Sequence, residues 1–314
     1  MTHAPSHAGK LPLWERLVFT MVFALMGTFV VVVTVSAANK VGPSALPAVS
    51  GGLPQEPAGG SGDTAKPGGS VRRRSHASLD QQLAAALRPM LRTNTGHVAV
   101  GVINVSTGAR ATFNGSRHFH AAGIEQADIL AALLLQDQQA RTKVTRQQAA
   151  LAVPMIENSD SHATTGLFAS IGGVTGLLAA NAQLGLTHTV AGPPGSWGLT
   201  RTTVADQLRL LADLTATRSP LSPGSRGYQL KLLRKARAAQ RWGVSSAASA
   251  GSSYAIKDGW VPDPALWVVN SIGVVDHDGQ QLLIAVLSNG QPTEAAGIVL
   301  DAAAAAAAAR VITR

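Results

Sequence analysis

An uninterrupted apolar run near the N-terminus constrains this chain more than any other feature. Leu17 to Ala38 covers 22 residues without a charged side chain and is rich in Val, Leu, Phe and Met. At a helical rise of 1.5 Å per residue, about 20 such residues cross the hydrocarbon core of a bilayer. A core helix of a soluble domain would carry a polar face, which this run lacks. We therefore expect a single transmembrane signal-anchor over residues 17–38.

The flanking charges predict the orientation of this anchor. Lys10, Glu15 and Arg16 precede it with a positive balance, so the positive-inside bias keeps residues 1–16 in the cytoplasm and places the rest of the chain outside. The small residues of Val35-Ser36-Ala37 leave a second possibility open, a cleaved signal peptide and a secreted product. Either way the C-terminal part is predicted to be extracytoplasmic.

A linker separates the apolar run from the rest of the chain. Residues 41–70 contain 8 Gly and 5 Pro, a composition typical of a flexible, extended tether. We place the linker at residues 39–78 and a single globular domain at residues 79–314, where regular periodicity begins.

Composition excludes several classes of function. The 314 residues include no cysteine, so no disulfide, thiolate metal site or cysteine nucleophile can form. Aromatic residues are only 4%, too few for stacking platforms on single-stranded nucleic acid. The formal net charge is +9, but only +5 of it falls in residues 79–314. Because the domain is only mildly basic, we expect no nucleic-acid partner.

The order of predicted elements indicates an α+β fold. Leucines four residues apart from Leu79 to Leu91 predict a first helix, and two short strands follow it. A helical middle section comes next, then three more strands and a closing helix that contains Ala302–Ala309. Strands at both ends of the domain must meet in one five-stranded antiparallel sheet, with N- and C-terminal helices beside it and the middle as an all-helical lobe. The predicted segments are strands at 98–103, 109–113, 253–261, 266–275 and 281–287, helices at 129–135, 145–184 (broken at Gly172-Gly173) and 202–214, a loop at 187–200 and a turn at 276–279.

Four landmarks in this order resemble the class A serine β-lactamases and the wider family of penicillin-recognising serine hydrolases. They resemble, in turn, the start of the family's buried helix, its Ser-Asp-Asn motif, the end of its omega loop, and its Lys-Thr-Gly strand with the strand beside it. The landmarks are Phe119–Leu135, Met155–Thr164, Trp197–Leu208 and Ile256–Trp260 with Trp267–Gly273. The resemblance covers residues 79–314. Within the family, this region most resembles the exported β-lactamase-like proteins of actinobacteria.

The reacting half of the family's site is missing at the matching positions. The resemblance implies a Ser-x-x-Lys at the start of the buried helix, where the amine activates the nucleophilic hydroxyl one turn away. This chain has Gly123 and Gln126 there. Glycine offers no nucleophile, and an amide does not accept a proton near neutral pH. The family also uses a Glu in the omega loop for deacylation, and residues 187–200 contain no acidic residue.

The binding half is partly kept. Ser159-Asp160-Ser161 retains the first two positions of its motif, and Lys257-Asp258-Gly259 retains the Lys and the Gly. By resemblance these residues line the pocket, with Ser159 facing Lys257 across the cleft. Asp258 stands where a hydroxyl residue is usual, and its charge should partly neutralise Lys257.

We therefore predict a membrane-anchored, catalytically degenerate β-lactamase-like domain that needs no cofactor or metal. Its expected ligand is a peptidoglycan peptide, a β-lactam or a protein partner. The alternative is an active serine hydrolase, a β-lactamase or D,D-peptidase, with a relocated nucleophile; Ser159 beside Lys257 is the candidate pair. Neither the ligand nor the oligomeric state follows from the sequence.

Other distinctive residues have plainer interpretations. His118, His120 and His162 lack the spacing of metal ligands and are expected near the surface or the pocket edge. The last three tryptophans of the sequence are expected in the core or the pocket wall. They are Trp242, Trp260 and Trp267.

Overall fold

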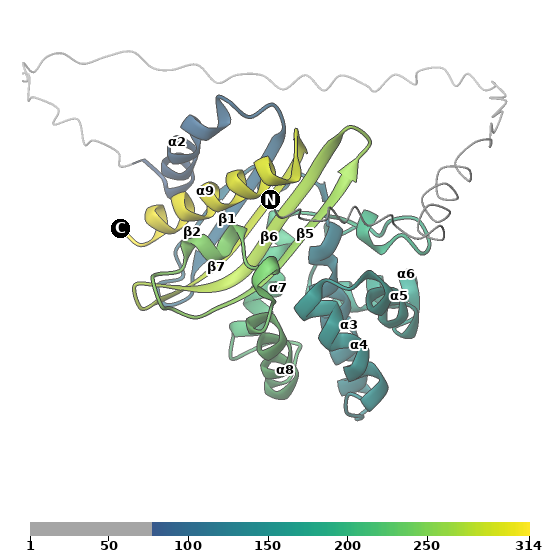
Figure 1. Ribbon diagram of the computed structural model, residues 1–314. Coiled ribbons are helices and arrows are strands. Elements are labelled where there is room, and N and C mark those ends of the chain that lie inside the picture. The colour runs from purple at the N-terminus through teal and green to yellow at the C-terminus, as the bar shows by residue number, and fades with distance from the viewer. Residues whose placement is uncertain (1–76) are drawn as a thin grey trace, which may run out of the picture. The chain divides into compact units, whose positions relative to one another are not determined.

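The computed structural model describes residues 77–314. The predicted cytoplasmic segment 1–16, the transmembrane anchor 17–38 and nearly all of the linker 39–78 lie outside the described residues (grey in Figure 1). The predicted domain boundary at residue 79 coincides with the first residue of helix α2, which Ser78 caps through a reciprocal hydrogen-bonded pair with Gln81.

A five-stranded antiparallel sheet forms the centre of the domain, as predicted (Figure 1). Its strand order is β2-β1-β7-β6-β5, so the first strands of the domain pair directly with the last. The N-terminal and C-terminal parts of the domain therefore share one sheet, and β5 is an edge strand next to the helical lobe. The strands are β1 (His97–Asn104), β2 (Arg110–Phe113), β5 (Tyr254–Asp263), β6 (Leu266–His277) and β7 (Gln280–Gln291), and a separate short pair joins β3 (Phe119–His120) to β4 (Arg201–Thr202).

The helices divide between the two faces of the sheet. Helices α2 and α9 share one hydrophobic core with the residues of one face, whereas α3 to α8 share a second core with the other face. Alternation along the strands separates the two sets, so Ala255 faces the helical lobe and Ile256 faces α9. The α-helices are α2 (Leu79–Leu91), α3 (Glu125–Gln139), α4 (Arg146–Asn158), α5 (Ser161–Ser170), α6 (Gly173–Leu184), α7 (Val204–Thr215), α8 (Pro223–Arg234) and α9 (Glu294–Ile312), and short 3₁₀ turns are η1 (Ala122–Ile124), η2 (Trp197–Leu199), η3 (Ala238–Gln240) and η4 (Gly243–Ala247).

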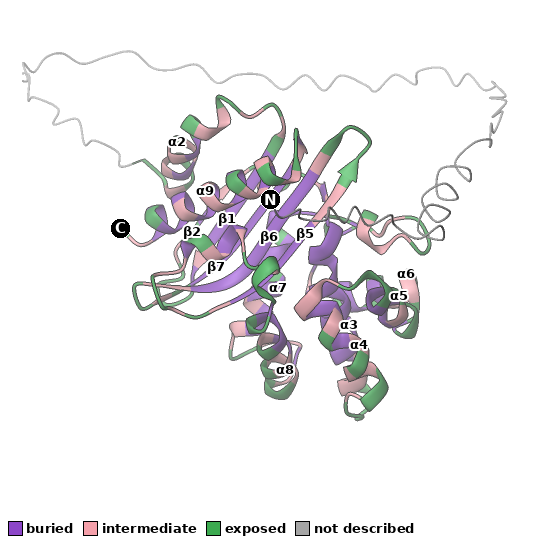
Figure 2. Cartoon of the chain, in the orientation of Figure 1, coloured by how far each residue is buried: buried purple, intermediate pink, exposed green. Residues whose placement is uncertain are grey.

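Helix α9 is apolar and long enough to cross a membrane by length and composition alone. Here it packs against the sheet and against η4, and most of its residues are buried in the domain (Figures 1 and 2). Its composition is therefore explained by its place in the core.

Two helical boundaries differ from the sequence prediction. The predicted break at Gly172-Gly173 is present, where both residues have positive φ, but the chain also breaks between α4 and α5 at Ser159. Ser159 takes φ +59°, in the left-handed region, and Asp160 then caps α5. The buried helix begins at Glu125, one turn before the predicted Ile129, and its first turn carries the buried polar residues Glu125, Gln126 and Asp128.

Candidate functional site

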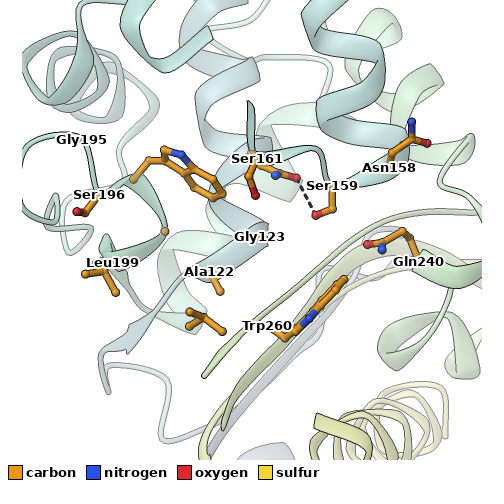
Figure 3. Close-up of a pocket in the computed structure, with 14 residues that line it drawn as sticks. Ala122, Gly123, Asn158, Ser159, Ser161, Gly195, Ser196, Leu199, Gln240 and Trp260 are labelled. Carbon is orange, nitrogen blue, oxygen red and sulfur yellow. Dashed lines mark hydrogen bonds between the residues drawn. The ribbon is translucent and has the colours of Figure 1, made fainter. Parts of the chain in front are cut away.

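A cavity of about 480 Å³ lies where the helical lobe meets edge strand β5 (Figure 3). Five separate parts of the chain build it: η1 with the start of α3, the junction of α4 and α5, the loop around η2, the end of η3, and the C-terminal part of β5. Its lining residues are Ala122, Gly123, Gln126, Asn158, Ser159, Ser161, Gly195, Ser196, Trp197, Gly198, Leu199, Gln240, Trp260 and Val261.

Gly123 stands in the floor of this cavity with its backbone pressed against β5. A Cβ atom placed on Gly123 would lie 2.8 Å from the carbonyl oxygen of Asp258 and 2.9 Å from Cα of Gly259. Both are backbone atoms, so any side chain at position 123 would require the strand to shift. Gly259 makes the approach possible from the other side, because a Cβ there would collide with the backbone nitrogens of Gly123 and Ile124.

Gln126 is fully buried and bridges two hydroxyl groups of the helical lobe. Its Nε2 donates to Oγ1 of Thr164 at 2.9 Å, and its Oε1 accepts from Oγ of Ser159 at 3.1 Å. The amide thus holds the Ser159 hydroxyl in a fixed orientation, but it offers that hydroxyl no base.

Ser159 reaches the cavity because of the break between two helices. Its left-handed backbone ends α4, and the Asp160 carboxylate accepts from the backbone N–H of Ala163 at 2.8 Å to start α5. Asp160 is exposed and acts as this cap, whereas Ser161 lines the cavity with Ser159. The motif positions predicted for binding therefore divide into two pocket hydroxyls and one structural carboxylate.

Lys257 lies directly behind Ser159. Its Nζ donates to Oγ of Ser159 at 2.9 Å and to the carbonyl oxygen of Asp258 at 2.6 Å, and the side chain is buried. Burial lowers the pKa of Lys257 to about 8, although the negative charge of Asp258 opposes this shift. The expected facing of Ser159 and Lys257 is present, but Lys257 does not itself line the cavity.

The structure places Asp258 away from the predicted pocket. Lys257 points toward the helical lobe, so strand alternation turns Asp258 to the α9 face. There its carboxylate accepts from the hydroxyl of Ser271 and the backbone N–H of Trp242. Burial raises the pKa of Asp258 to about 7, against the opposing influence of Ser271 and Lys257. The Asp258 carboxylate therefore acts on Lys257 through its charge, while the Asp258 backbone carbonyl accepts the hydrogen bond from Lys257 Nζ.

Two buried carboxyl groups behind the floor of the cavity have no counterpart in the sequence prediction. Glu125 and Asp128 point into the lobe from the first turn of α3, and neither is exposed. Burial and the neighbouring Asp128 raise the pKa of Glu125 well above its usual range. Burial raises the pKa of Asp128 to about 8, partly offset by the amide of Gln207, which donates to it at 3.3 Å. Their position within an otherwise apolar stretch was the available signal.

The loop from residue 187 to 200 forms one end of the cavity (Figure 3). It joins the lobe through Ala121, whose N–H donates to the carbonyl of Thr200 at 2.7 Å, and through the Trp197 indole, which donates to Oγ1 of Thr165 at 3.3 Å. Its residues in the cavity are Gly195, Ser196, Trp197, Gly198 and Leu199. The loop therefore presents an indole, a hydroxyl and backbone to the cavity, and no carboxylate.

The opposite end of the cavity contains residues that motif comparison missed. Asn158 precedes Ser159, Gln240 ends η3, and Trp260 follows the Lys257-Asp258-Gly259 motif on β5. The Trp260 ring packs against Trp242, with ring centroids 6.0 Å apart. Trp260 was expected in the core or pocket wall, and it lies in the wall. Nothing in the sequence pattern marks Asn158 or Gln240.

No group of three His, Asp or Glu side chains within residues 77–314 is arranged to hold a metal ion. His118 and His120 instead contact the backbone carbonyls of His188 and Leu199 through their ring nitrogens, at 2.9 and 3.2 Å. His162 is exposed.

Comparison with known proteins agrees with this fold. The model of the β-lactamase enzyme family matches residues 135–312, which is more than half of the chain. No curated protein matches the sequence significantly.

Solved structures share the fold at low sequence identity. A β-lactamase from Xanthomonas campestris superposes with a TM-score of 0.65 at 18% identity, over 75% of this chain and 99% of that one. The protein PBP-A superposes with a TM-score of 0.66 at 21% identity, over 74% and 96%. A class A β-lactamase from Bacteroides cellulosilyticus superposes with a TM-score of 0.64 at 16% identity, over 75% and 97%.

Proposed function

Because this chain belongs to the β-lactamase enzyme family, we propose that its domain binds a ligand in the family's cleft and forms no acyl-enzyme with it. In this proposal residues 79–314 are an extracytoplasmic binding domain, held at the cell membrane by residues 17–38. Cell-wall peptides, β-lactams and a protein partner are the ligand classes to be tested, and turnover is not part of the role.

The close contact at Gly123 carries this proposal. Covalent catalysis needs a nucleophile at the floor of the cleft, and this position holds neither a side chain nor the space for one. The amine that would activate such a nucleophile is replaced by Gln126, whose two polar atoms are already bonded to Thr164 and Ser159. In a serine protease with a catalytic triad, loss of the nucleophile lowers turnover by about 10⁶-fold.

Covalent labelling tests the proposal directly. The full-length protein is incubated with a fluorescent penicillin, separated on a denaturing gel and analysed by intact-mass spectrometry, beside an active class A β-lactamase as a positive control. We expect no labelled band and no mass increase. A stoichiometric adduct on any side chain of the cleft would contradict the proposal.

A second candidate function rests on the 2.9 Å contact between Lys257 Nζ and Ser159 Oγ. A neutral Lys257 could in principle activate Ser159, and a pKa of about 8 makes a minor neutral fraction available at neutral pH. The hydrogen-bond directions oppose this reading, since Lys257 donates to Ser159 and the Ser159 hydroxyl donates to Gln126.

Ser159→Ala distinguishes the two functions. If the second candidate holds, nitrocefin hydrolysis rises as Lys257 loses its proton near pH 8 and disappears in Ser159→Ala. If the binding function holds, both proteins stay at the background rate across the same pH range. Ser161→Ala is the matched control, because it removes a neighbouring cavity hydroxyl that is not a hydrogen-bond partner of Lys257.

A further inference from the structure

The cavity described above is uncharged. None of the 14 described residues that line it carries a formal charge. Lys257, the nearest cation, lies behind Ser159 with hydrogen bonds to Ser159 and to the Asp258 carbonyl, and Asp258 balances its charge from the other face of β5. An anionic ligand therefore meets no free cation in the lining, and a cationic ligand meets no carboxylate.

Two lining residues have buried hydrogen-bond acceptors without a donor among the described residues. These atoms are Oδ1 of Asn158 and Oε1 of Gln240. A buried acceptor left without a partner costs free energy. Both oxygens are covered in the ligand-free protein, so a ligand recovers this energy by supplying an N–H or O–H group once the amide turns its oxygen into the cavity. A carboxylate cannot do this because it only accepts hydrogen bonds. The two unpartnered amide oxygens thus favour a ligand that has hydrogen-bond donors.

Two tryptophans contribute apolar surfaces to the same cavity. Trp197 is oriented by its indole bond to Thr165, and Trp260 is supported by the ring of Trp242. Both indoles are half-buried and line the cavity from different elements, η2 and β5 (Figure 3). Ser159, Ser161 and Ser196 add hydroxyl groups, which both donate and accept.

We propose that this cavity binds a neutral saccharide, with the C–H faces of a sugar ring against Trp197 and Trp260 and its hydroxyl or N-acetyl N–H groups on Asn158 and Gln240. A sugar combines apolar ring faces with many hydrogen-bond donors and has no charge, which matches each property of the lining. This inference rests on the proposed non-acylating function, and it assigns to the same cleft a ligand class other than the peptides, β-lactams and proteins considered there.

The test uses the full-length protein and chitotetraose, a neutral oligomer of N-acetylglucosamine, with binding followed by calorimetry and tryptophan fluorescence. Benzylpenicillin is the anionic comparison and choline the cationic one. We expect saturable binding of chitotetraose that is at least about tenfold tighter than that of either comparison. Tighter binding of choline or penicillin, or no binding of chitotetraose, would overturn the inference.

Matched variants locate the binding. Trp260→Ala should weaken chitotetraose binding by about tenfold and Trp260→Phe by less, whereas Trp267→Ala, on β6 outside the cavity lining, should leave it unchanged. Gln240→Leu should weaken binding severalfold without lowering stability, because it removes an acceptor that has no protein partner. Equal effects of Trp260→Ala and Trp267→Ala would contradict the assignment.

The outcomes separate this inference from the proposed function. A covalent penicillin adduct on the wild-type protein contradicts the non-acylating function and the inference that depends on it. No adduct together with no saccharide binding contradicts the inference alone.

Discussion

The two walls of the cleft differ in what they keep of the family's chemistry. On the wall formed by α4, α5 and β5, the Ser159 hydroxyl and the Lys257 ammonium stay within one hydrogen bond of each other. On the wall formed by η1 and α3, the backbone of β5 closes onto Gly123, and in the proposed function Gly123 and Gln126 stand in place of the reacting pair. We call the first the preserved wall, because it keeps a polar contact, and the second the repacked wall, because backbone fills the space beside Gly123.

This difference indicates that the first wall has a structural role independent of catalysis. The hydrogen bond between Ser159 and Lys257 joins the helical lobe to the sheet, which is a structural role whether or not the domain reacts with a substrate. On the η1 wall the contact is backbone packing of β5 against Gly123, and carboxyl groups without a counter-charge are buried behind it.

The pH dependence of stability should show the largest effect, and it belongs to the repacked wall. Because burial raises the pKa of Asp128 from 3.8 to about 8, the folded state holds a proton that the unfolded state releases. This stabilising contribution is complete below pH 3.8 and is lost as the pH rises toward 8. Over this range Asp128 should lower the free energy of unfolding of the wild type by up to about 1.4 kcal/mol for each pH unit. We expect Asp128→Asn to remove this contribution, so that its free energy of unfolding, measured by urea denaturation, falls less steeply with pH.

Asp263→Asn serves as the control for that measurement, since Asp263 is an exposed carboxyl at the end of β5. Its profile should run parallel to that of the wild type. If Asp128→Asn also runs parallel, Asp128 is ionised in the folded protein and the two walls do not differ in this respect.

Lys257→Met tests the preserved wall and should have the next largest effect. It removes the positive charge that stabilises the ionised form of the buried Asp258, and it removes the hydrogen-bond donor to Ser159. Losing a buried hydrogen bond that involves a charged group costs about 1.5–3 kcal/mol. Urea denaturation at pH 7 measures this loss.

Two further variants interpret the result. Lys231→Met changes an exposed lysine on α8 and should be neutral. Adding Asp258→Asn to Lys257→Met should recover part of the loss, because the uncompensated carboxylate is then gone. An unchanged stability for Lys257→Met would mean that the preserved wall does not depend on this contact.

The fold could be predicted from the sequence because local patterns determine most of it. The alternation of the strands and the leucine spacing of α2 define the sheet and its first helix, and both are present. The break at Ser159 was missed because it depends on one residue in the left-handed region. No periodicity of the surrounding sequence marks such a residue.

The candidate site was only partly predictable for a related reason. Motif positions identified Gly123, Gln126, Ser159 and Lys257, which the structure brings together. Strand alternation already implied that Asp258 faces away from a Lys257 that points into the cleft, but the motif comparison treated them as one unit. Trp197 and Gln240 line the cavity because of the paths of two irregular segments, around η2 and η3. Hydrophobic periodicity in the sequence does not predict such paths.

Gly123→Ser should have the smallest effect on stability, yet it tests the comparison most directly. The new Cβ would press on the backbone of β5 at Asp258 and Gly259, so we expect a loss of about 1–3 kcal/mol in unfolding free energy. Gly227→Ser is the matched control, because no atom lies within 4 Å of a Cβ at that position on α8. The double variant Gly123→Ser, Gln126→Lys should still fail to hydrolyse nitrocefin, since the serine would enter a site whose floor is already occupied by the strand. Restored hydrolysis in that variant would show that only the side chains were lost and that the second wall was never repacked.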